Sequence, residues 1–205
     1  MKTILQVNAS ILSDAGQSSQ LANEFVNALK EDGAQVIRRD LASEPVPHLT
    51  AERFGAFLSQ PENRTKEQQS VLDYLNALID ELKRADTIVL GLPMYNFGLP
   101  SMLKAYFDHV ARAGVTFRYT EKGPVGLLTG KKAYVFATRG GIYAGTKRDT
   151  QTAYVRDFLA FLGITDVEFV YAEGLAISEA SKADSLAKAR ATIPAILQQL
   201  VPTLA

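Results

Sequence analysis

The chain has 205 residues, 47% of them hydrophobic, which is enough to bury one sizeable core and predicts a single domain over residues 1–205. Its 22 basic and 22 acidic residues are interspersed and sum to zero charge, so neither nucleic acid nor an anionic membrane surface is an expected partner. Cysteine is absent, which excludes disulfides, thiolate metal sites and a cysteine nucleophile.

The two ends of the chain carry no targeting or anchoring signal. The N-terminus enters a strand pattern at once, with no signal peptide before it. The apolar segment 193–204 is too short to span a bilayer and contains Pro194 and Pro202. These features predict a cytoplasmic protein without a membrane partner.

Strand and helix patterns alternate along the chain. In the first helical pattern apolar residues recur at the spacing of one helix face, and Gly33 is a plausible stop after it. The predicted strands cover residues 2–7, 35–39, 87–92, 132–137 and 167–171. The predicted helices cover residues 18–30, 65–83, 101–112, 151–162 and 181–199.

Two segments do not fit this alternation. Residues 44–64 carry three prolines and form a long connection, either a lid or a short helical excursion. Residues 115–130 place Phe117 and Tyr119 in alternation with polar residues, followed by Gly123-Pro124, which predicts an inserted hairpin or an extended loop.

Five βα units in this order predict an α/β fold, with a five-stranded parallel sheet and helices on both faces. Right-handed crossovers and a switch in winding direction favour the flavodoxin-like strand order 2-1-3-4-5, a three-layer sandwich. In this order the first and third strands are neighbours. The loops 8–19, 93–100 and 138–149 should therefore meet at the carboxyl edge of the sheet, where such folds bind ligands.

The loop after the third strand, residues 91–101, is the most informative of the three. Two prolines and two glycines hold it in a defined, non-helical shape. It presents Tyr95 and Asn96 at the end of a buried strand. An aromatic beside an amide suits a flat ligand with polar edges, for which a flavin ring is the candidate.

The loop after the first strand is rich in hydroxyl groups and opens a helix. Ser10, Gln17 and Ser18 are candidates to bind a phosphate at the helix N-terminus. The alternative is that Ser18 or Ser19 is simply the N-cap. Neither G-x-x-x-x-G-K-[ST] nor G-x-G-x-x-G is present, which leaves a mononucleotide phosphate.

The loop after the fourth strand places Gly140 and Gly141 directly behind Thr138 and Arg139. Backbone amides without side chains can approach the polar edge of a ring closely, although a tight turn explains paired glycines equally well. Arg139 is either a surface charge or a residue whose backbone matters more than its guanidinium.

These motifs together resemble the FMN-dependent NADH:azo/quinone oxidoreductases, over nearly the whole chain from the first strand through the fifth. The segments that carry the resemblance are 10–12, 17–18, 93–97, 111–120, 130–133, 139–141, 163–167 and 172–174.

The resemblance implies a flavodoxin-like homodimer with one FMN per subunit and active sites at the interface. It places the FMN phosphate at Ser10, Gly16, Gln17 and Ser18. It places the ring against Met94, Tyr95, Asn96, Phe97, Thr138, Arg139, Gly140 and Gly141. Gly16 and Thr138 stand where serine is common in that family, and residues 44–64, which match it poorly, border the predicted substrate pocket.

The resemblance also implies the chemistry. A hydride passes from NADH or NADPH to the flavin N5, and a quinone or an azo compound is reduced next in the same place. No catalytic side chain and no metal is predicted, and Asn96 is expected to bond the polar edge of the ring. A flavodoxin-type electron carrier without substrate turnover is the alternative function.

Three further residues have open roles. Phe117 and Tyr119 are either core residues of the hairpin or, as the resemblance suggests, reach the partner's flavin pocket. For His109 a position on the helix surface or at an interface is favoured over proton chemistry.

Overall fold

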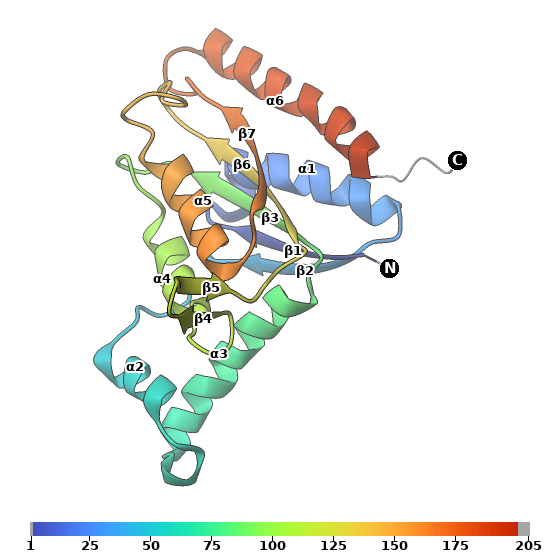
Figure 1. Cartoon of the computed structure of the whole chain (residues 1–205). Helices are drawn as coiled ribbons and strands as arrows, with labels where there is room; N and C mark the ends of the chain where they lie inside the picture. The colour runs from blue at the N-terminus through green and yellow to red at the C-terminus, as the bar shows by residue number, and fades with distance from the viewer. Residues whose placement is uncertain (1, 201–205) are drawn as a thin grey trace.

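The computed structural model describes residues 2–200 and has a five-stranded parallel sheet at its centre, in the order β2-β1-β3-β6-β7 (Figure 1). The strands are β1 Thr3–Asn8, β2 Gln35–Asp40, β3 Thr87–Pro93, β6 Lys132–Thr138 and β7 Asp166–Ala172. Without the short β4–β5 hairpin, this is the predicted order 2-1-3-4-5.

Helices cover both faces of the sheet. Figure 1 shows α1 and α6 on one face and α3, α4 and α5 on the other. The helices are α1 Gln17–Glu31, α3 Lys66–Arg84, α4 Ser101–Val110, α5 Thr150–Leu162 and α6 Glu179–Leu200.

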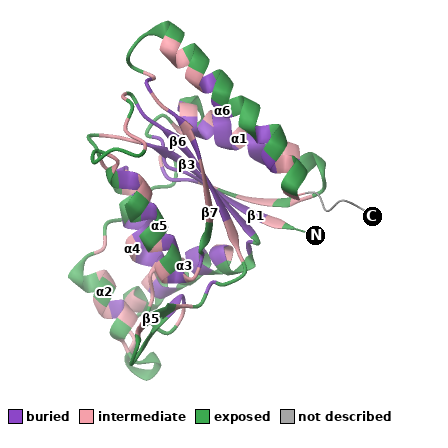
Figure 2. Ribbon diagram, turned by 45° about the horizontal axis from the view of Figure 1, so that its top comes forward, coloured by how far each residue is buried: buried purple, intermediate pink, exposed green. Residues whose placement is uncertain are grey.

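The central strand β3 shows why the sheet must be covered twice. Ile88 and Leu90 are buried in the apolar cluster under α3, α4 and α5, whereas Val89 is buried in the cluster under α1 and α6. Successive side chains of a strand point to opposite faces, so both faces of β3 require apolar residues. All seven residues of β3 are buried, and Figure 2 shows this strand in purple at the centre of the sheet.

The predicted elements are confirmed to within two residues at each end. One of the larger shifts is at α4, which was expected to reach Arg112 and ends at Val110. Thr116 accounts for this end, because its hydroxyl donates to the Val110 carbonyl at 2.7 Å and accepts from the Arg112 N–H at 2.9 Å. A side chain thus replaces the next turn of helix.

For each of the two segments outside the alternation, the structure decides between the two alternatives. Residues 44–64 contain the short helix α2 Ala51–Leu58, whose N-cap Thr50 accepts from the Arg53 N–H, followed by a 3₁₀ turn at Pro61–Asn63. Residues 115–130 contain an antiparallel hairpin, β4 Phe117–Thr120 and β5 Gly123–Gly126. The helical excursion and the inserted hairpin are therefore confirmed.

Within residues 2–200, no helix has the length and apolar character needed to cross a membrane. Residues 201–204 of the apolar C-terminal segment lie outside the described part of the chain.

Candidate functional site

The three predicted loops meet at the carboxyl edge of the sheet. The Tyr95 hydroxyl links the first two loops, since it lies 3.4 Å from Ser10 Oγ and accepts from the Ile11 N–H at 3.3 Å. The Met94 N–H donates to the Thr138 carbonyl at 2.9 Å, which joins the second loop to the third. The convergence predicted from the strand order is confirmed.

The first loop ends in a helix N-terminus without a side-chain cap. Gly16 is the N-cap of α1, so the expectation that Ser18 or Ser19 caps the helix is wrong. Both serines lie inside the first turn, buried, and their Oγ atoms have no hydrogen-bond partner within residues 2–200. The first N–H groups of a helix have no partner inside it. Uncapped amides beside unpartnered hydroxyls fit the phosphate of a mononucleotide.

Gly16 is needed for the shape of this loop. A Cβ at position 16 would overlap the side chain of Ser10, so only glycine lets Ser10 keep its present place. Ser10 is itself 1% exposed, and its Oγ accepts from the Leu12 N–H at 3.1 Å. Glycine at position 16, where serine is common in the family that the chain resembles, thus packs closely against Ser10 in the predicted phosphate site.

The second loop contains a strained turn. Tyr95 and Gly98 pair through two backbone hydrogen bonds, and the two residues between them have positive φ, 49° for Asn96 and 61° for Phe97. Positive φ at both central positions is the pattern of a type I′ turn, which favours Asn-Gly. Phenylalanine is unusual in that conformation. The turn exposes Asn96 and Phe97 at the edge of the sheet, where strain in a backbone often accompanies function.

The third loop is organised by a buried arginine. The side chain of Arg139 is 0% exposed and pairs with Asp149 at 2.7 Å and with Glu173 at 3.1 Å. The interpretation of Arg139 as a surface charge is therefore wrong. Both terminal nitrogens of its guanidinium have partners inside the protein, whereas Nε has none within residues 2–200. The guanidinium is thus turned away from the surface, which leaves the backbone of the loop to face a ligand.

The carboxylates around Arg139 hold the loop and the start of α5. Glu173 Oε1 also accepts from the main-chain N–H groups of Tyr143 and Ala144, at 2.8 and 2.9 Å. Asp149 is the N-cap of α5 and accepts from the Thr152 N–H. Burial alone would raise the pKa of Asp149, but the hydrogen bonds from Arg139 and Thr152 outweigh it and leave the pKa below its ordinary value.

The paired glycines have a packing role of their own. A Cβ at Gly141 would overlap the ring of Tyr143, and a Cβ at Gly140 would press on Ala176. The Tyr143 ring in turn meets Phe97 edge to face, with 5.4 Å between ring centroids. The absence of a side chain at Gly141 therefore allows an aromatic contact between the second and third loops.

Phe117 and Tyr119 differ in their surroundings. Phe117 is 6% exposed and packs on Phe161 with ring centroids 4.2 Å apart, so it belongs to the core of the hairpin. Tyr119 is 74% exposed and meets Phe117 only at its edge. Their predicted place in a partner's flavin pocket stays a prediction.

His109 does not lie on the helix surface as expected. It is 0% exposed, its Nδ1 lies 2.8 Å from the Ala105 carbonyl, and its Nε2 has no partner within the described chain. Burial lowers the pKa of His109, and the charge of Arg53 lowers it further. The ring belongs to the last turn of α4, away from the carboxyl edge.

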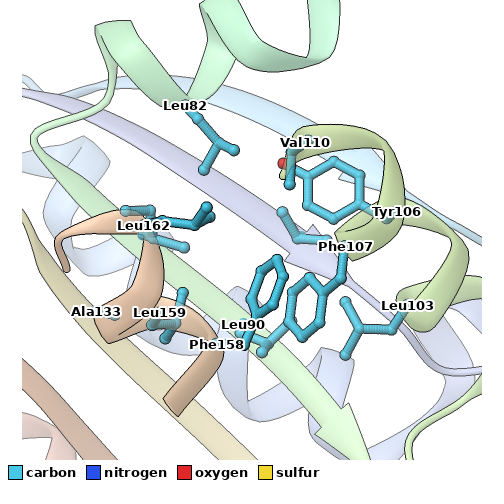
Figure 3. Close-up of a pocket in the computed structure, with 12 residues that line it drawn as sticks. Leu82, Leu90, Leu103, Tyr106, Phe107, Val110, Ala133, Phe158, Leu159 and Leu162 are labelled. Carbon is cyan, nitrogen blue, oxygen red and sulfur yellow. The ribbon is translucent and has the colours of Figure 1, made fainter. Parts of the chain in front are cut away.

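Two hollows elsewhere do not suit a mononucleotide. Figure 3 shows the first, between β3, α4 and α5, where Leu90, Phe107 and Phe158 face one another. Its volume of about 20 Å³ is close to that of one water, and its lining is apolar. The second, about 440 Å³, lies at the amino ends of the strands, and there Lys131 already donates to the carbonyls that end α3.

The comparison with known proteins agrees with this geometry. A family model described as a flavodoxin-like fold matches residues 2–197. A protein of Cellvibrio japonicus named FMN-dependent NADH:quinone oxidoreductase is 55% identical over 190 residues, which are 92% of this chain and 96% of that protein. The chain belongs to the family of FMN-dependent NADH:quinone oxidoreductases. The resemblance inferred from the motifs is confirmed.

Two further proteins extend the comparison. The FMN-dependent NADH:quinone oxidoreductase of Alcanivorax borkumensis is 55% identical over 192 residues, 93% of this chain and 97% of that protein. The solved structure of an FMN-dependent NADH-azoreductase of Bacillus anthracis in complex with FMN is 29% identical, with a TM-score of 0.88. It covers 98% of this chain and 99% of that one.

Several residues that shape the site had no predicted role. Glu173 lies in a segment that carried the resemblance, yet nothing in its spacing indicates an ion pair with Arg139. The start of α5 was placed by its helical pattern alone, although Asp149 followed by Thr152 is a recognisable N-cap signal. Gln151 gave no signal at all, because its contacts lie more than fifty positions away in the chain.

Proposed function

We propose that this chain takes a hydride from NADH and reduces quinones to hydroquinones and azo compounds to amines, by a ping-pong mechanism at an FMN held by the three loops. The observation that carries the proposal is the uncapped N-terminus of α1, with buried, unpartnered Ser18 beside it, next to the strained turn that exposes Asn96. The enzyme is an oxidoreductase with FMN as cofactor and NADH as donor, in agreement with its relatives.

The phosphate of FMN would be held by the first loop. The N–H groups of Gln17 and Ser18 stand at the positive end of the α1 dipole, and Ser10 and Ser18 supply hydroxyls. Gly16 supports this contact indirectly, because it leaves room for the Ser10 side chain. No lysine or arginine is required for this contact.

The ring would lie against the second and third loops. Asn96 would bond its polar edge, with backbone groups of Phe97, Gly140 and Gly141 serving the rest, while Met94 and Tyr95 provide apolar surface. Thr138 ties the two loops through its carbonyl, and Arg139 holds the third loop from inside. We propose no side chain as a general base.

When bound, FMN would supply two-electron transfer between NADH and the acceptor, once for each quinone and twice for each azo bond that is cleaved to two amines, with protons from solvent completing the products. The protein's own groups orient the two substrates in turn and exclude water from the edge of the ring. Because both substrates would use the same place, the oxidised nicotinamide, NAD⁺, must leave before the acceptor enters.

We further propose a homodimer with active sites at the interface. Tyr119 on the hairpin and Phe54 and Leu58 on α2 are 74%, 50% and 68% exposed. Figure 1 shows the hairpin and α2 at the same end of the molecule. Exposed apolar side chains gathered at one end suit burial against a second copy. The single-domain organisation and cytoplasmic location predicted from the sequence stay predictions.

An anaerobic titration tests the proposal. The visible absorption of the FMN-loaded protein is followed while NADH and then benzoquinone are added. Bleaching by NADH and recovery with quinone are expected. Bound flavin that NADH cannot bleach would support the electron-carrier alternative. A protein that binds no flavin would contradict the assignment of all three loops to an FMN site.

Asn96→Ala tests the role of the second loop. We expect FMN affinity or the rate of flavin reduction to fall by about tenfold, since one hydrogen bond to the ring is lost. FMN fluorescence and stopped-flow absorbance measure the two quantities. Unchanged affinity together with an unchanged rate would remove Asn96 from the site.

A further inference from the structure

The first turn of α5 is bound to the turn that exposes Asn96 and Phe97. Gln151 is 0% exposed, and its Nε2 donates to the Pro93 carbonyl at 3.0 Å and to the Gly98 carbonyl at 2.8 Å. Both neighbours are acceptors, so the side-chain amide can present only its NH₂ group to them. The orientation of this amide is therefore fixed by its surroundings.

These two bonds close the 93–98 loop at both ends. Pro93 is the last residue of β3, and Gly98 is the residue that completes the turn with Tyr95. The neighbouring Thr150 donates through its hydroxyl to the carbonyl of Phe97, between them. Two consecutive residues of α5 thus bind three carbonyls of one short loop.

The loop needs such support from outside. Within it, the Tyr95–Gly98 pair supplies two hydrogen bonds, of 2.9 and 3.3 Å. Against them stands the cost of positive φ at Asn96 and at Phe97, residues that both carry a Cβ. A strained turn persists where its surroundings over-determine it, and the buried Gln151 side chain contacts both ends of the 93–98 loop that contains this turn.

We propose that Gln151 is a positioning residue for the flavin: its amide holds the 93–98 loop in the strained shape that presents Asn96 and Phe97. The inference rests on the proposed function, because it assumes that the ring lies against this loop. Gln151 itself is fully buried beneath the loop. Its effect passes through the two carbonyls and the turn between them.

The third loop should be unaffected by the loss of the Gln151 side chain. Glu173 binds the Tyr143 and Ala144 amides of the third loop, and Gln151 has no part in that contact. The Gly98 N–H donates to the Tyr95 carbonyl inside the turn, so it should exchange faster if the turn opens when the Gln151 side-chain amide is lost. The Tyr143 N–H, which donates to Glu173, should stay protected. General destabilisation would raise exchange at both.

The test compares Gln151→Leu with the wild-type holoenzyme. Dilution of each FMN-loaded protein releases FMN, whose fluorescence gives the dissociation constant. We expect Gln151→Leu to raise it by about tenfold or more, since two carbonyls lose their donor, and to shift the visible spectrum of the flavin that stays bound. Leu159→Ala is the matched control, because Leu159 is buried in the same helix two turns away. It should lower stability without changing the spectrum.

Gln151→Glu gives a readout that a purely structural role would not move. An ionised carboxylate would face the Pro93 and Gly98 carbonyls without a proton to donate, whereas a protonated one can donate to one of them. Burial raises the pKa of such a carboxyl. FMN binding by this variant should therefore improve relative to wild type as the pH falls from about 8 to about 6.

The outcomes separate this inference from the proposed function. If wild type binds FMN and oxidises NADH with a quinone, while Gln151→Leu matches it in affinity, spectrum and Gly98 exchange, the inference is wrong and the function stands. The inference is equally wrong if Leu159→Ala shifts the spectrum as much, or if Gln151→Glu shows the pH dependence of wild type. A wild type that binds no FMN would overturn the proposed function first.

Discussion

The loops after β3 and β6 lie side by side at the carboxyl edge of the sheet, and they are held by different physical means. The loop after β3 is strained and depends on neutral donors, Gln151 and Thr150, that bind its carbonyls. The loop after β6 depends on a buried arginine between two carboxylates, Asp149 and Glu173. Both sets of contacts involve the first turn of α5.

The two kinds of contact place different demands on the sequence. Hydrogen bonds to main-chain carbonyls fix the path of the backbone whatever side chains the turn displays. A buried ion pair requires particular residues, and losing one partner leaves an uncompensated charge. The loop after β3 should therefore tolerate changes in Asn96 or Phe97 without unfolding, whereas the loop after β6 should not tolerate the loss of Arg139.

Arg139→Met should have the largest effect on stability. It removes the cation between Asp149 and Glu173, both largely buried, and the free energy of unfolding should fall by about 3 to 5 kcal/mol. Urea denaturation of wild type and variant measures the difference.

The exposed Arg156 offers a matched control, since it is an arginine that donates to a neutral acceptor, the Val167 carbonyl, at the protein surface. Arg156→Met should cost less than about 1 kcal/mol. An equal fall in the free energy of unfolding of the two variants would mean that the buried pairs around Arg139 stabilise the protein no more than a surface hydrogen bond does.

Phe97→Gly should separate stability from activity in the other loop. Glycine removes the cost of positive φ, about 1 to 2 kcal/mol, while the lost edge contact with Tyr143 costs about 0.5 to 1.5 kcal/mol. The free energy of unfolding should change by less than about 1 kcal/mol, whereas kcat/KM for a quinone should fall by about tenfold.

Phe97→Ala sharpens this test, because it loses the same ring and keeps the Cβ in the strained conformation. We expect it to match Phe97→Gly in activity and to be less stable by about 1 kcal/mol. Two variants of equal stability would show that the turn is not strained at position 97.

Acid should weaken the charged contacts around Arg139 selectively, with a smaller effect on stability than the substitutions above. The pKa of Asp149 is lowered from 3.8 in the folded protein, so its contribution to stability is fully present above about pH 4 and is lost as the pH falls through the folded value. Hydrogen exchange below pH 4 should increase at the Thr152 amide, which donates to Asp149, relative to the Gly98 amide.

Asp149→Asn is the control for this titration, since an amide at position 149 does not ionise. Its Thr152 amide should exchange at the same rate, relative to Gly98, at every pH. A wild-type ratio that also stays constant would exclude Asp149 as the source of acid sensitivity.

Much of the fold follows from local sequence patterns. The five strands and five long helices are set by apolar periodicity within each segment, and their alternation permits few sheet orders. The three loops could also be interpreted from their own residues, because glycine, proline and hydroxyl residues after a strand indicate a turn or a ligand-binding loop without reference to the rest of the chain. The family resemblance rested on the same short segments.

Local patterns therefore determined the fold class, the edge where the ligand-binding loops meet and the family. The tertiary structure was needed to show that Arg139 and His109 are buried, that Gly16 makes room for Ser10 and that Gln151 closes a loop 58 positions away. The physical reason is range. Periodicity and turn chemistry act between neighbours in the chain, whereas burial, steric overlap and hydrogen-bond partners depend on segments that only folding brings together.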